Sequence, residues 1–216
     1  MRTVRLDEAS KKDLLDTLLK RSPNNYEQYS DTVAKIVEQV RTEGDRALFE
    51  LTRKFDWEGI SAANIQVTEE EFQEAYEKID ERLLVTIRKS LKNIRAYHEK
   101  QKQYSWFDST PQGTLLGQKV TPLRAAGVYV PGGKAVYPSS VLMNIVPAKI
   151  AGVEQVIMAT PCGRDGKVNP AVLCAAREAG ADAVYKMGGA QAIAAMAFGS
   201  TASLPRPSSR PPSPST

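Results

Sequence analysis

AAGVYVPGG at residues 125–133, followed by YPSSVLMNIVPAKI at 137–150, is the stretch of sequence that decides the fold. An apolar run of strand length is stopped by Pro-Gly-Gly, a combination that marks a turn. Ser139 and Ser140 favour a helix N-terminus, so we expect them to cap a helix that runs to about Ile150. The stretch predicts a buried strand, a glycine-rich turn and a helix in direct succession.

The same succession occurs twice more toward the C-terminus. Asn169 and Pro170 suit the N-cap and first position of a helix, and Gly188-Gly189 leads into an alanine-rich one. Strands that alternate with helices over short connections form right-handed βαβ units around a parallel sheet. The predicted fold class is therefore α/β, with amphipathic N-terminal helices followed by a partial Rossmann-like parallel sheet. The expected strands are 115–120, 125–130, 153–160 and 181–187.

The N-terminal region, 1–103, is charged and predicted to be helical. Apolar residues recur at helical spacing in four stripes, the first formed by Val33, Ile36, Val37 and Val40. Gly44 is typical of a helix C-cap and Asp45 of the next first turn. Each stripe has to be buried against something, and a second subunit is one candidate, which gives a predicted homodimer.

Further local signals divide this region into elements. Thr68 and Glu71 have the spacing of a capping box, and Asp80 is placed to start a long helix. Ile65 and Val67 suggest a short strand just before the capping box.

Composition excludes several classes of protein. Two of the four net positive charges belong to Arg206 and Arg210 in the last sixteen residues. The remaining net charge of the chain is too small to predict a nucleic-acid-binding surface. No stretch is apolar enough to span a bilayer, so no membrane partner is expected. Two cysteines do not make a disulfide framework, and a cytoplasmic location with reduced thiols is the expectation.

The last segment, 201–216, reads TASLPRPSSRPPSPST. Its five prolines and five serines favour disorder, because Leu204 is the only sizeable apolar residue that it offers for burial. The predicted organisation is a helical region at 1–103, a nucleotide-binding region at 104–200 and a disordered tail at 201–216.

Two glycine-rich turns are candidate ligand sites. One follows the strand at 125–130, where Lys134 adds a positive charge, and the other is Met187-Gly-Gly-Ala-Gln191. Ligands bind beyond the carboxyl ends of parallel strands, and helix N-termini attract anions. Neither turn matches a phosphate-loop or dinucleotide fingerprint, so an ordinary turn that uses glycine for its geometry is the alternative in both cases.

Single reactive side chains give weaker indications. His98 is the only histidine and falls on an apolar stripe, which favours packing over catalysis. Cys162 follows a strand, where catalytic residues gather in α/β folds, but no general base accompanies it and a structural role is the alternative.

Taken together, the motifs resemble histidinol dehydrogenase. The matching segments are GVYVPGG at 127–133, YPSSVLMNIVPAKIAGV at 137–153, GGAQAIAAMAFGS at 188–200 and, more weakly, RTEGDRALFELTRKFD at 41–56. The resemblance implies NAD-dependent oxidation of L-histidinol to L-histidine by a zinc-containing homodimer. It also implies that Tyr129 and Gln191 contact NAD, and that Ser139 and Ser140 face the nucleotide and substrate.

The chain departs from the family after residue 200. The family continues to a GPGN turn, a catalytic Glu-His pair and zinc ligands, none of which stands in this sequence. We therefore expect an N-terminal half with no catalytic or metal-binding residues, inactive alone. A non-catalytic interaction subunit and a stand-alone nucleotide-binding module remain as alternatives.

Overall fold

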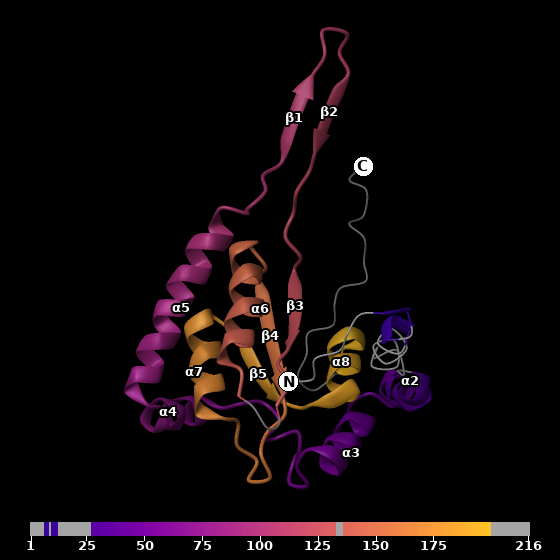
Figure 1. Cartoon of the computed structure of the whole chain (residues 1–216), viewed down its shortest axis with the longest axis vertical. Helices are drawn as coiled ribbons and strands as arrows, with labels where there is room; N and C mark the ends of the chain where they lie inside the picture. Colours follow the sequence, from indigo (N-terminus) through magenta and orange to yellow (C-terminus); the bar gives the residue numbers. More distant parts are fainter. Residues whose placement is uncertain (1–6, 9, 13–26, 133–135, 200–216) are drawn as a thin grey trace.

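The computed structural model describes residues 7–8, 10–12, 27–132 and 136–199 of the 216 (Figure 1). The disordered tail predicted at 201–216 and the charge predicted at Lys134 lie outside the described residues. The elements are α2 (Glu27–Glu43), α3 (Asp45–Phe55), α4 (Glu69–Lys78), α5 (Glu81–Glu99), β1 (Trp106–Ser109), β2 (Leu115–Gln118), β3 (Ala125–Tyr129), α6 (Pro138–Ile150), β4 (Gln155–Thr160), α7 (Pro170–Ala179), β5 (Ala183–Lys186) and α8 (Gly189–Phe198).

A parallel sheet with the strand order β3-β4-β5 forms the centre of the molecule. Helices cover both of its faces, in three layers (Figure 1). Successive residues of β4 face opposite ways: Val156 and Met158 pack with α4–α7, and Ile157 packs with α2, α3 and α8. The predicted α/β class with a parallel sheet is confirmed.

Local signals in the N-terminal half produce the helix boundaries that they predict. Gly44 has φ 61° and ends α2 just before Asp45 starts α3. Both hydrogen bonds of the capping box join Thr68 and Glu71, and the Asp80 carboxylate accepts the N–H of Leu83.

The predicted strand at Ile65 and Val67 is reduced to a single antiparallel bridge between Gln66 and Tyr185. Val67 donates its N–H to the Val184 carbonyl at 2.9 Å, and Lys186 donates to Ile65 at 2.7 Å. This short pairing covers the outer edge of β5.

The apolar stripes of the N-terminal helices are buried within the same chain. Val40 of α2 and Leu48 of α3 pack with α8, whereas Ile87 of α5 packs with α6 and α7. Val33, the first residue of the α2 stripe, is 44% exposed. The stripes are thus largely covered without a second subunit.

One expectation about local structure is wrong. Ser139 and Ser140 lie inside the first turn of α6, whose N-cap is Tyr137, because the helix already begins at Pro138. The strand expected at 115–120 is present as Leu115–Gln118, and it pairs with Trp106–Ser109 in an antiparallel hairpin outside the parallel sheet. That pairing is set by a tight turn in which the Gly113 N–H bonds to Thr110 and φ of Gly113 is 85°.

The β1–β2 hairpin extends away from the three layers as an arm (Figure 1). We call residues 104–123 the hairpin arm. All residues of both strands are exposed. No helix among the residues described is long and apolar enough to cross a membrane.

Candidate functional site

The second glycine-rich turn brings together the two residues for which a nucleotide contact is predicted. Tyr129 ends β3, and its hydroxyl accepts the N–H of Gly189 at 3.1 Å. Gln191 lies in the first turn of α8 and is 1% exposed. Parallel strands place their carboxyl ends at one edge of the sheet, which is why residues 62 positions apart (191 − 129) meet here.

A carboxylate from the N-terminal region closes the other side of this turn. Asp56, at the C-terminus of α3, accepts the N–H of Gly188 at 2.9 Å. A Cβ on Gly188 would lie 2.8 Å from Asp56 Oδ1 and 2.9 Å from Pro161 Cβ, so only glycine fits. Burial raises the pKa of the Asp56 carboxyl, and the hydrogen bond from Gly188 opposes that rise.

The buried Gln191 carboxamide carries a donor that no described residue satisfies. Its Nε2 has no hydrogen bond to any described residue. The amide lies close to Gly189, at the start of its own helix. A Cβ added to Gly189, where φ is +61°, would lie only 2.6 Å from Gln191 Oε1. Leaving such a donor unsatisfied costs about 1–3 kcal/mol. The turn therefore offers a donor to an acceptor that none of the described residues supplies.

The first glycine-rich turn is less informative. Ser139 is exposed and Ser140 is half-buried, both at the start of α6. Neither side chain is hydrogen-bonded to Tyr129 or Gln191 in the part of the chain that the structure describes.

A cavity of about 1100 Å³ lies beside the second turn, beyond the carboxyl end of β4. Asp56 lines it together with Cys162, whereas Tyr129 and Gln191 do not. Burial, and next the negative charge of Asp56, raises the pKa of the Cys162 thiol. A thiol held protonated is a weak nucleophile, so these surroundings do not activate Cys162.

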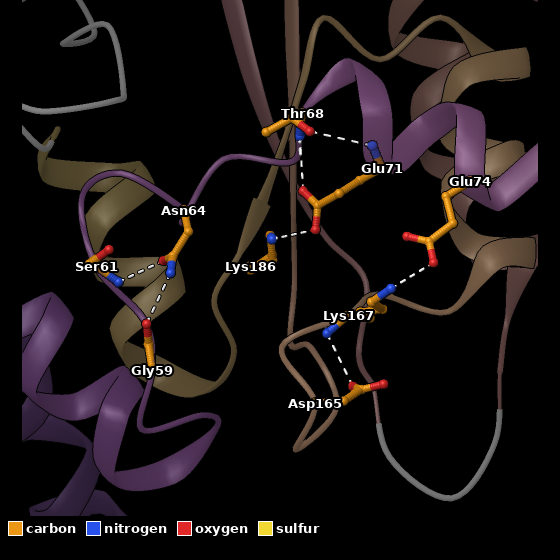
Figure 2. A network of polar contacts seen from close by, with 9 residues as sticks. All are labelled: Gly59, Ser61, Asn64, Thr68, Glu71, Glu74, Asp165, Lys167 and Lys186. Atoms are coloured by element: carbon orange, nitrogen blue, oxygen red, sulfur yellow. Dashed lines mark hydrogen bonds and ion pairs between the residues drawn. The ribbon is translucent and has the colours of Figure 1, made fainter.

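Two ion pairs attach α4 to the sheet and to the loop after β4 (Figure 2). Lys186, 4% exposed at the end of β5, contacts Glu71 Oε1 at 2.5 Å, and the Thr68 N–H occupies the other oxygen of that carboxylate. Lys167 contacts Glu74 at 2.6 Å on the loop side. The interaction with Lys167, and then that with Lys78, lowers the pKa of Glu74 to about 2.

Sequence reasoning missed Asp56 and Lys186. Asp56 is the last residue of the segment quoted at 41–56 but was given no role there, Lys186 lies outside the quoted segments, and each acquires its partner only through the tertiary fold. The position of Lys186 at the carboxyl end of a strand was the one available signal.

The single histidine lies away from this turn. His98 is half-buried on α5, with Nδ1 2.7 Å from the side-chain oxygen of Gln101. Among the described ranges no three His, Cys, Asp or Glu side chains are placed to hold a metal ion.

Fold and turn together define a class: parallel α/β domains that offer ligands a site beyond the carboxyl ends of their strands. A family model described as histidinol dehydrogenase matches residues 19–207. The histidinol dehydrogenase of Bacillus subtilis is 55% identical over 182 residues, and that of Heliobacterium mobile is 52% identical over 184. The crystal structure of histidinol dehydrogenase from Elizabethkingia anophelis superposes with a TM-score of 0.74 at 33% identity.

The chain belongs to the histidinol dehydrogenase family. The matches cover 84% and 85% of this chain but only 42% and 43% of the two relatives. For the crystal structure the shares are 81% of this chain and 40% of the other. The chain thus spans less than half the length of the relatives that it matches.

Proposed function

We propose that this chain supplies the first part of a Rossmann-like, NAD-binding domain for the oxidation of L-histidinol to L-histidine. The observation that carries the proposal is the meeting of Tyr129 and Gln191 at the Gly188–Gly189 turn, with the Gln191 donor unsatisfied. Buried polar groups in proteins are nearly always hydrogen-bonded. A bound dinucleotide would supply the missing acceptor.

The two residues have distinct roles in this proposal. Gln191 donates a hydrogen bond to the nucleotide, and Tyr129 fixes the turn through Gly189 while its half-buried ring borders the ligand. Contacts of Ser139 and Ser140 with nucleotide or substrate stay a prediction. NAD would accept the hydride in the oxidation.

Zinc does not fit the described residues, which offer no suitable group of ligands. We propose that zinc binding and proton transfer require a portion of the family sequence that this chain does not contain, so that the chain alone does not oxidise histidinol. A cytoplasmic location is likewise a proposal.

Calorimetric titration with NAD tests the nucleotide site. We expect Gln191→Ala and Tyr129→Phe each to weaken NAD binding about tenfold, as expected for the loss of about 1.4 kcal/mol. Matched controls are Gln73→Ala on the exposed face of α4 and Tyr97→Phe, 62% exposed on α5. Absence of NAD binding by the wild-type chain at millimolar concentration would contradict the proposal.

A spectrophotometric assay of NADH formation tests the proposed inactivity. The purified chain with L-histidinol, NAD and zinc should show no turnover above the blank. Addition of an intact family enzyme is the positive control. Turnover by the chain on its own would show that its residues suffice for the chemistry.

A second function, as an interaction subunit, is favoured by the hairpin arm. Six large apolar side chains on it are each more than half exposed: Tyr104, Trp106, Phe107, Leu115, Leu116 and Leu123. The strand register places Trp106 and Leu116 on one face, with Phe107 and Leu115 on the other. An isolated two-stranded hairpin is marginally stable in water, so both faces call for a partner.

We propose that the partner is a second copy of the chain, bound through reciprocal contacts of the arms. Taking roughly 150–250 Å² for a large aromatic side chain, the exposed parts of the six side chains amount to about 600 Å² per chain. Two copies would then bury about 1,200 Å², the lower end of stable interfaces. In this proposal the dimer surface is the hairpin arm, whereas the sequence predicted a dimer through the N-terminal helices.

Light scattering coupled to size-exclusion chromatography tests the dimer. We expect Trp106→Ser combined with Leu116→Ser to raise the dimer dissociation constant at least tenfold. The control Lys119→Ser alters the arm without removing an apolar side chain, and it should leave the dimer dissociation constant unchanged. A wild-type chain that remains monomeric at 100 μM, about a hundredfold above a micromolar dissociation constant, would rule out this interface.

A further inference from the structure

We propose that Asp56 serves as a built-in anion at the N-terminus of α8, so that this turn accepts an uncharged hydrogen-bond acceptor of the ligand and excludes its phosphates. The inference rests on the proposed nucleotide site, and it names which part of the nucleotide binds there. It also makes Asp56 a positioning residue for the turn.

The outermost N–H groups of the turn are already occupied by side chains. Gly188 donates to the Asp56 carboxylate at 2.9 Å, and Gly189 donates to the Tyr129 hydroxyl at 3.1 Å. A phosphate at a helix N-terminus uses N–H groups of the first turn, and these two are the outermost of that set. A phosphate that bound to the N–H of Gly188 or of Gly189 would have to displace Asp56 or Tyr129.

Electrostatic repulsion by Asp56 also disfavours a phosphate at this turn. The positive end of the α8 dipole is balanced by a carboxylate that is half-buried and held by a backbone hydrogen bond. A phosphate placed there would meet a like charge at close range, where partial burial weakens solvent screening. The buried cation at the end of β5, Lys186, is paired with Glu71 at 2.5 Å. Lys186 is therefore not free to offset the charge of Asp56 at this turn.

The unsatisfied donor indicates what the turn does accept. Gln191 Nε2 is buried, has no hydrogen-bond partner within the described part of the chain, and lies against Gly189 at the start of α8. A neutral planar acceptor satisfies it without approaching Asp56 as a second anion. The dinucleotide carries this chemistry in two places, the carboxamide oxygen of nicotinamide and the ring nitrogens of adenine.

Amide NMR of the ¹⁵N-labelled chain tests the inference with three probes: inorganic pyrophosphate, nicotinamide and adenosine. In the wild-type protein we expect pyrophosphate to leave the Gly188 to Ala192 signals unshifted, and at least one neutral probe to move them. Which neutral probe acts distinguishes the two sources of the acceptor. In Asp56→Asn, pyrophosphate should shift the same signals with at least tenfold higher apparent affinity.

Asp165→Asn is the matched control, because Asp165 is an exposed carboxylate on the loop beside the cavity. It should respond to pyrophosphate like the wild-type protein. If Asp56→Asn does not fold, Asp56→Ser provides the same comparison.

Three results would each overturn the inference: pyrophosphate shifting the wild-type turn signals, both neutral probes leaving those signals unmoved, or an Asp56 variant whose signals do not respond to pyrophosphate. The last result would remove Asp56 as the cause of exclusion. None of these measurements uses NAD. Failure of the wild-type chain to bind NAD would instead count against the proposed nucleotide site.

Discussion

At the scale of single residues, the site depends on side chains whose roles come from distant parts of the chain. Asp56 ends a helix and contacts Gly188, which is 132 positions away. Cys162 stands at a favourable strand end, yet burial and Asp56 raise the pKa of its thiol. The position of a residue along the chain therefore indicates where a functional side chain could lie. The residues that pack around it determine its hydrogen-bond partners and its pKa.

Gly188→Ala tests the close packing of the turn. The added Cβ would lie 2.8 Å from Asp56 Oδ1 and 2.9 Å from Pro161 Cβ, so the backbone has to shift. We expect a loss of about 1–3 kcal/mol in the free energy of unfolding, measured in urea. Gly163→Ala is the control, because its new Cβ meets chiefly the exposed side-chain carboxylate of Asp165. Equal losses of unfolding free energy in both variants would show that the turn at Gly188 is not packed more closely than the control position.

At the scale of elements, sequence patterns succeed where the cause is local. Glycine at position 44 and the Thr68–Glu71 capping box set helix boundaries through their own backbone, and both are predictable. The hairpin partner of Leu115–Gln118 was missed because Trp106–Ser109 shows no alternation of apolar and polar residues. Likewise, the contact of Asp56 with Gly188 depends on how α3 packs near α8, which no short motif encodes.

The three helices that meet at Glu178 allow a test of inter-element coupling. Arg88 of α5 contacts Glu178 of α7 at 2.7 Å, and the Tyr76 hydroxyl of α4 donates to it at 2.9 Å. The Arg88 interaction chiefly lowers the pKa of Glu178. Because the folded pKa lies below the unfolded value of about 4.3, this stabilisation is present above pH 4.3 and is lost as pH falls through the folded pKa.

We expect Glu178→Gln to lower the free energy of unfolding at pH 7 by about 1–2 kcal/mol, a range reduced because Arg88 is largely exposed. The difference from the wild-type protein should shrink as the pH is lowered below 4. Urea denaturation at a series of pH values measures both effects. Glu77→Gln, on the exposed face of α4, is the control. A difference independent of pH would indicate lost packing in place of lost charge.

At the scale of the whole molecule, the two edges of the sheet differ. The outer edge of β5 is paired with residues 65–67, whereas β3 has no strand partner on its outer side among the residues described. Val130 donates its N–H to Ala159 of β4, so alternation directs the Gly127 and Tyr129 N–H groups toward the open side. The alternation of strands and helices along the sequence predicts the class of fold, but the covering of one edge by Gln66 arises from tertiary packing.

Hydrogen exchange distinguishes these edges. We expect the Lys186 amide, bonded to Ile65 at 2.7 Å, to exchange at least a hundredfold more slowly than the Gly127 amide. Val128, whose N–H points into the sheet, is the internal control and should be protected like Lys186. Slow exchange at both Gly127 and Tyr129 would mean that a second copy or another segment covers β3. Dilution separates these causes, because protection by a second copy falls with protein concentration and protection by the chain itself does not.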